Sequence, residues 1–148
     1  MQVTRQITND ITYVGVSDRR LSLFENIFPI PRGVSYNSYI INDEKTALID
    51  AVDYDSSRVF VENVKAALNG KTLDYIVINH MEPDHCALIG DIVRRYPAVK
   101  IVGNTKTFGM MNQFFGTDFS ERSVVVKEGD TLSAGKHTLH FVMAPMVH

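Results

Sequence analysis

Four side chains that can bind metal lie within six residues of one another near the middle of the chain. The segment His80-Met81-Glu82-Pro83-Asp84-His85 places His80, Glu82 and Asp84 at alternate positions. In an extended backbone, alternate side chains point the same way, so these three can converge on one ion. His85 would then point elsewhere, toward a second ion. The spacing therefore predicts one side of a two-metal site.

The donor chemistry of this segment favours iron over zinc. Carboxylates are hard oxygen donors that suit iron or manganese, whereas sites rich in histidine and cysteine favour zinc. The alternating set contains no thiolate, which indicates non-haem iron, although zinc also accepts Asp and Glu. A purely structural interpretation stays open at this point, because Asp84 can cap a following helix and His80 can merely end a strand.

The elements around the motif predict an α/β layered fold. Apolar and β-branched runs predict strands at 11–16, 35–41, 46–50, 73–78, 99–102, 124–126 and 137–143. Apolar residues at helical spacing predict helices at 56–68, 86–96 and 105–115. The run 73–78 is continuously apolar, as in a strand buried on both faces. The motif follows it directly, at the carboxyl end of a strand where ligands collect in open α/β sheets.

Composition bounds the class of protein. With 45% hydrophobic and 22% charged residues, the chain should bury a core. A net charge of −2 without a basic run argues against nucleic acid or an anionic membrane as the main partner. The apolar runs are too short to span a bilayer, and no secretory signal precedes them. We therefore expect a soluble, cytoplasmic protein.

Other reactive residue types receive structural interpretations. The single cysteine, Cys86, cannot form an internal disulfide, and we expect a small buried residue on the inner face of its helix. His137 and His140 are three residues apart, so on a strand they face opposite sides and are expected to be surface or hydrogen-bonded histidines. Met110 and Met111 belong to an apolar helix that we expect to serve as core or interface.

The motif also resembles that of a known family. A strand followed by H-x-H-x-D-H is the metal-binding signature of the metallo-β-lactamase superfamily, and here Glu82 replaces the second histidine. In this form the motif resembles that of the flavodiiron proteins. The stretch 31–39 followed by 48–50 is similar to the opening hairpin of that family, and 144–148 resembles the segment that carries its next histidine ligand.

This resemblance implies a fold and a set of site residues. The fold would be the αββα sandwich of the metallo-β-lactamases, with about its first half in this chain. His80, Glu82 and His148 would hold one iron. Asp84 would hold the second iron, with His85 a ligand in some members and turned away in others. Asp50 would support the metal ligands without binding the metal itself, or would simply serve in a turn or as a cap at the strand end.

The same resemblance implies an activity. Flavodiiron proteins reduce dioxygen to water or nitric oxide to nitrous oxide at two iron ions. Their electrons come from flavin mononucleotide in a flavodoxin-like domain, which residues 1–148 do not contain, and the flavin is reduced by a partner such as rubredoxin. In the family two subunits pack head to tail, so a homodimer is implied.

The chain is shorter than a whole member of the family. The bridging aspartate and the last histidine of the family lie beyond His148, so we expect a fragment, a processed piece or one part of an assembly. Two other functions stay open. One is a zinc hydrolase of the same superfamily, against which Glu82 counts. The other is a non-catalytic role, either an oxygen-sensing diiron module or an inert truncation product.

Overall fold

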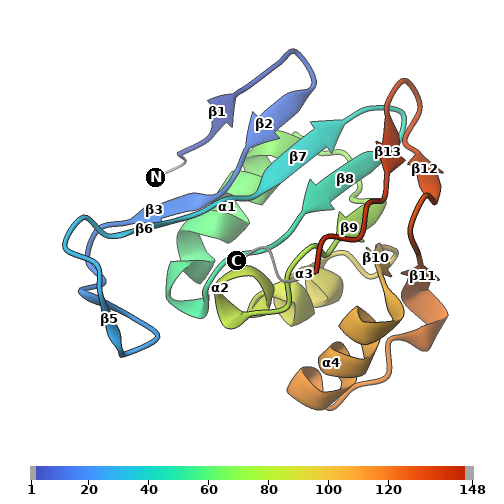
Figure 1. The fold of residues 1–148 in the computed structure, drawn as a ribbon. Helices are drawn as coiled ribbons and strands as arrows, with labels where there is room; N and C mark the ends of the chain where they lie inside the picture. Colours follow the sequence, from blue (N-terminus) through green and yellow to red (C-terminus); the bar gives the residue numbers. More distant parts are fainter. Residues whose placement is uncertain (1–2, 146–148) are drawn as a thin grey trace.

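The structure, a computed structural model, describes residues 3–145 and is built around one seven-stranded sheet (Figure 1). The strand order is β1-β2-β7-β8-β9-β10-β11. These strands are β1 (Arg5–Gln6), β2 (Ile11–Tyr13), β7 (Tyr39–Asn42), β8 (Thr46–Ile49), β9 (Tyr75–Val77), β10 (Lys100–Gly103) and β11 (Ser123–Val125). Pairing is antiparallel from β1 to β8 and parallel from β8 to β11. The predicted α/β class and the hairpin that joins β7 to β8 are confirmed.

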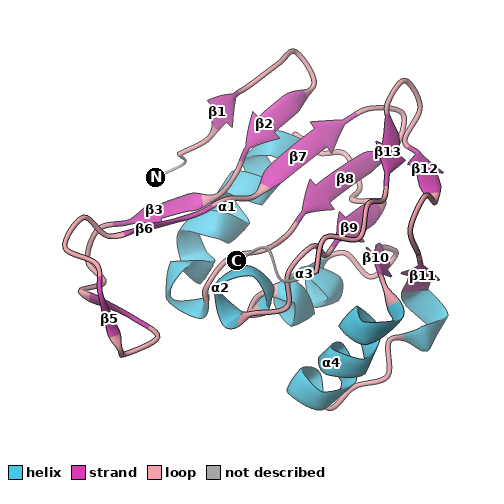
Figure 2. Ribbon diagram, viewed as in Figure 1, coloured by secondary structure: helices cyan, strands magenta, loops and turns pink. Residues whose placement is uncertain are grey.

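The helices gather on one face of this sheet (Figure 2). They are α1 (Ser57–Leu68), α2 (Pro83–Cys86), α3 (Ile89–Arg95) and α4 (Thr105–Phe115), with 3-10 turns η1 (Tyr54–Ser56) and η2 (Ser120–Arg122). Ile76 and Ile101 point from the sheet into the core that the helices cover. That core is the larger of the two, and it fixes the positions of β9 and of the loop that follows it.

A second, smaller core lies on the opposite face of the sheet. Val77 and Val102, the next residues of the same two strands, enter this core. It is covered by the two-stranded hairpin of β12 (Thr131–Ser133) and β13 (Thr138–His140), through residues such as Leu132 and Leu139. Strand β9 is therefore buried on both faces, as its continuously apolar sequence predicted.

Two predicted strands are each broken in the middle. The run 11–16 divides into β2 and β3 (Val16–Asp18), and 35–41 divides into β6 (Val34–Tyr36) and β7. At the break, the backbone N–H groups of Val14 and Gly15 both donate to the carbonyl oxygen of Ser38. A side chain at Gly15 would collide with the backbone oxygen of Tyr36. The close approach of these two segments bends both strands and places β3 and β6 in a separate two-stranded sheet.

The boundaries of the remaining elements agree with the prediction in one helix and differ in others. Helix α4 has the predicted bounds, since the Asn104 side chain accepts from the N–H of Thr107 and Gly116 ends the helix with φ +58°. The helix expected at 86–96 instead begins at Pro83 as α2 and begins again at Ile89 as α3. Proline suits the first turn of a helix, where its missing N–H is not needed. Strand 137–143 is shorter than predicted and pairs with the unpredicted β12.

The stretch 21–30, for which the sequence predicts no helix or strand, forms a hairpin of β4 (Leu23–Phe24) and β5 (Phe28–Pro29). Glu25 and Asn26 adopt positive φ values of 52° and 58° at its tip. The hairpin extends away from the main sheet (Figure 1). Within residues 3–145, no helix has the length and apolar character needed to cross a membrane.

Candidate metal centre

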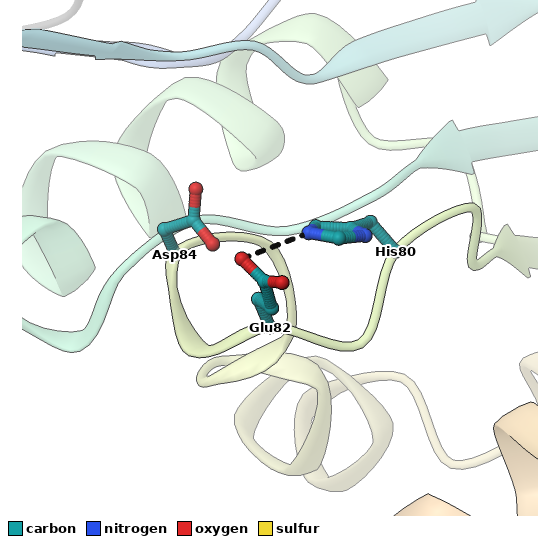
Figure 3. A group of neighbouring side chains, drawn as sticks. All are labelled: His80, Glu82 and Asp84. Atoms are coloured by element: carbon teal, nitrogen blue, oxygen red, sulfur yellow. Dashed lines mark ion pairs between the residues drawn. The ribbon is translucent and has the colours of Figure 1, made fainter. Parts of the chain in front are cut away.

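Three of the predicted ligands converge at the carboxyl end of β9. His80 and Glu82 lie in the loop after the strand, and Asp84 lies in the first turn of α2. Each side chain offers one ligand atom, and these atoms all lie within 4.8 Å of one another. Figure 3 shows the three side chains turned toward a common point, with Nε2 of His80 3.2 Å from Oε2 of Glu82. Such a cluster has the size and donor types of a cation site.

The way in which these side chains converge differs from the sequence prediction. The backbone is not extended through Asp84, because α2 begins at Pro83. The helical turn, rather than strand alternation, brings the Asp84 carboxylate back toward His80 and Glu82. Glu82, not Asp84, occupies the N-cap position, and its side chain makes no capping hydrogen bond. The alternative that Asp84 serves as a helix cap is therefore wrong.

His85 lies beside this group without belonging to it. Its ring centroid is 5.7 Å from that of His80 with the ring planes at 69°, and its Nε2 is 3.4 Å from Oδ2 of Asp84. His148, the remaining predicted ligand, lies outside the described residues. The ligand roles of all five residues remain predictions.

Two buried polar atoms at this site fit a bound cation. Oδ1 of Asp84 and Nδ1 of His85 have no hydrogen-bond partner among residues 3–145. A buried polar atom without a partner costs about 1–3 kcal/mol, and a cation bound to these two atoms would offset that cost. Carboxylate oxygen and imidazole nitrogen are both ligands of iron. The donor set therefore suits the predicted iron ions.

Asp50 lies behind the ligand loop, at the end of β8. Its Oδ1 accepts from the backbone N–H of Asn79 at 2.7 Å and of His80 at 3.4 Å, and its Oδ2 accepts from Nδ2 of Asn79 at 3.0 Å. Burial raises the pKa of the Asp50 carboxyl, and the hydrogen bonds from Asn79 oppose this rise. Asp50 thus contacts the backbone at the start of the loop.

Cys86 is buried and is not one of the three clustered metal-capable side chains. Its thiol donates to the carbonyl oxygen of Met81 at 3.1 Å, and burial raises the pKa of the thiol to about 11. The expectation of a small buried residue is confirmed. His137 is also hydrogen-bonded as expected, with Nδ1 2.7 Å from Oδ2 of Asp43, and His140 is exposed.

Sequence reasoning missed a pocket of about 390 Å³ that reaches Asp84. Its wall includes the β4–β5 hairpin, Tyr36 and the carboxylates of Asp53 and Asp55. Burial, and then the charge of Asp53, raise the pKa of Tyr36 to about 12. Glu25, Asp53, Asp55 and Asp84 line the pocket, so its wall is acidic and favours cations. Its residues come from distant parts of the sequence, so no local motif announces it.

Comparison with known proteins defines the class. The family model described as "ODP family beta lactamase" matches residues 34–148, and the chain belongs to this family. Flavodiiron proteins are among the solved structures with similar folds, and together with the family model they show a metallo-β-lactamase-like fold. The flavodiiron protein of Giardia intestinalis superimposes with a TM-score of 0.90 at 26% identity, over 100% of this chain and 36% of that one.

Particular relatives agree with this class. The rubredoxin oxygen:oxidoreductase of Desulfovibrio gigas matches 99% of the chain with a TM-score of 0.91 at 29% identity, over 36% of its own length. The "Anaerobic nitric oxide reductase flavorubredoxin" of Pectobacterium atrosepticum is 37% identical over 99% of this chain and 29% of its own. "Putative diflavin flavoprotein A 2" of Nostoc sp. is 32% identical over 98% of this chain and 25% of its own. The chain thus spans about a quarter to a third of these curated relatives.

Proposed function

We propose that the predicted ligands form one part of the diiron centre of a flavodiiron-type oxidoreductase. These ligands are His80, Glu82, Asp84, His85 and His148. The whole protein would reduce dioxygen to water, nitric oxide to nitrous oxide, or both. The relatives named above support this, since their names describe a nitric oxide reductase and an oxygen oxidoreductase. The carrying observation is the convergence of His80, Glu82 and Asp84 within 4.8 Å at the end of β9.

The proposed ligand roles follow the donor types. His80 and Glu82, together with His148, would hold one iron, and Asp84 would hold the other, with His85 beside it. Iron, when bound, supplies the electrons and the open coordination positions that bind and reduce a small diatomic gas. Glu82 and Asp84 contribute negative charge that offsets the charge of the ions. The thiol of Cys86 is buried and donates to the carbonyl oxygen of Met81, so the proposed ligand set consists of nitrogen and oxygen donors.

The remaining parts of the proposal concern partners. Electrons would come from flavin mononucleotide bound outside these 148 residues, in a flavodoxin-like domain of the whole protein. A donor such as rubredoxin would reduce the flavin, and a head-to-tail homodimer would bring one subunit's flavin near the other's iron. We place the protein in the cytoplasm.

Metal analysis of the full-length protein tests this proposal. We expect two iron ions per chain by mass spectrometry of the freshly purified protein, and consumption of dioxygen or nitric oxide at a gas electrode when a reductant is supplied. Glu82→Gln, with nearly the same shape but no charge, should lose iron and activity together. Stoichiometric zinc in the wild-type protein, with hydrolysis of a generic ester, would contradict the proposal and favour a zinc hydrolase.

A further inference from the structure

Asp50 is held in an unusual backbone conformation at the end of β8. Its φ is +54°, a left-handed value that is uncommon for a residue other than glycine. Two hydrogen bonds hold Asp50 in this conformation. The N–H of Asp50 donates to the carbonyl oxygen of Val77 at 2.9 Å. The buried hydroxyl of Ser38 donates to the carbonyl oxygen of Asp50 at 2.9 Å. The conformation aims the carboxylate of Asp50 at the residues that follow β9.

Asn79 occupies both oxygens of that carboxylate. Its backbone N–H binds Oδ1 at 2.7 Å and its side-chain amide binds Oδ2 at 3.0 Å. No lysine or arginine among residues 3–145 forms an ion pair with Asp50. Asn79 is therefore the main hydrogen-bond donor to a carboxylate that is 8% exposed. A buried charge needs such donors to remain ionised.

The position of Asn79 connects this contact to the metal centre. It comes directly before His80, so the two-point contact with Asp50 fixes the direction in which the chain enters the ligand loop. The backbone N–H of His80 adds a longer contact of 3.4 Å to the same carboxylate. Nε2 of His80 lies 3.2 Å from Oε2 of Glu82. A shift of Asn79 would therefore move His80 relative to Glu82.

We propose that Asn79 is a positioning residue, whose side-chain amide and backbone N–H clasp Asp50 and thereby hold His80 in place for metal binding. This inference rests on the proposed function only in requiring that the centre bind metal. Partners one step removed from a metal ligand typically change metal affinity by about 10–100-fold when they are lost. The loss of the Asn79 amide should have an effect of this size, because Oδ2 of Asp50 then has no donor among residues 3–145.

Metal titration of the full-length protein, stripped of its metal, tests this role. Co²⁺ is the probe, because the positions of its visible absorption bands report the arrangement of its ligands. We expect Asn79→Ala to weaken Co²⁺ binding at least tenfold and to shift the bands at saturation. Asn42→Ala is the matched control, since Asn42 likewise donates one side-chain amide bond, to the carbonyl oxygen of Ala67 at 3.1 Å, on strand β7. It should change neither the affinity nor the bands.

The outcomes separate this inference from the proposed function. If the wild type binds Co²⁺ and Asn79→Ala loses less than tenfold in affinity, Asn79 does not position the centre, and the diiron proposal stands. An equal loss in Asn42→Ala would also overturn the role, because it would mean a general loss of stability. A wild-type protein that binds neither Co²⁺ nor Fe²⁺ would overturn the proposed function and the role of Asn79 together.

Discussion

The backbone N–H of Ala51 donates to the carbonyl oxygen of His85 across 2.9 Å. Ala51 follows Asp50, whose carboxylate binds the backbone of Asn79 at the other end of the same loop. Two adjacent residues at the end of β8 therefore hold both ends of the segment that carries the ligands. A site whose backbone is held in this way is preorganised for its ligand. Changes to the ligand side chains should then alter metal binding more than they alter the fold.

Exchange of Glu82 for histidine should change which metal the protein retains. Glu82→His recreates the H-x-H-x-D-H pattern, and imidazole suits zinc better than a carboxylate does. We expect the ratio of zinc to iron in the purified full-length protein to rise severalfold, as measured by mass spectrometry of the metals. Glu82→Asp, which keeps the carboxylate, serves as the control and should retain iron preference. An unchanged ratio in Glu82→His would show that residue 82 does not select the metal.

Removal of the charge on Asp84 should release one of the two irons. Asp84→Asn keeps the shape of the side chain but removes the negative charge proposed to hold the second ion, so iron content should fall by about half. Asp91→Asn is a suitable control, because Asp91 lies shortly after the motif in α3 and forms an ion pair with Arg94. Retention of both irons in Asp84→Asn would argue against the ligand role of Asp84.

Loss of a buried aromatic side chain in α1 should destabilise the domain strongly. Phe60 has no exposed surface and packs in the helix-covered core. Large-to-small substitution of such a residue costs about 3–5 kcal/mol, so Phe60→Ala should lower the free energy of unfolding by that amount in a denaturant titration. Phe114→Ala in α4 is the matched control, since Phe114 is 56% exposed, and it should cost less than about 1 kcal/mol. Equal costs would mean that the helix layer is not packed as described.

Asp43 should make stability depend on pH. The backbone N–H of His137, and then its ring, hold the pKa of the Asp43 carboxyl well below its usual range. A lowered pKa in the folded state means that the ionised carboxylate stabilises the fold above about pH 4, the ordinary value for Asp, and that this stabilisation is lost as the pH falls further. Asp43→Asn should therefore lower the melting temperature at pH 7 and lower it less at pH 3.

The exposed neighbour Glu44 provides the control for this prediction. Glu44→Gln should change the melting temperature little at either pH. Hydrogen exchange of residues 131–140 gives a second readout, because His137 belongs to the hairpin that Asp43 holds. A melting temperature of Asp43→Asn that differs from wild type by the same amount at both pH values would contradict the prediction.

The sequence by itself determined the elements that depend on local pattern. The continuous apolar run of β9, the helical spacing of α1 and the capped bounds of α4 all appear in the structure because burial and capping act within a few residues. The ligand motif was also readable, since its donor types identify the chemistry without reference to the fold. Local pattern likewise predicted that Cys86 is a buried residue.

Only the tertiary structure decided how these parts meet. The breaks at Gly15 and Ser38 arise from contact between two segments that the sequence keeps apart, and each segment alone looks like an unbroken strand. The start of α2 at Pro83 turns Asp84 toward His80 and Glu82. The sequence predicted the same convergence for a different reason, the alternation of side chains in an extended backbone. The contact of Asn79 with Asp50 joins residues 29 positions apart. Such contacts form only when the strands pair into a sheet, and no local pattern of residues records that pairing.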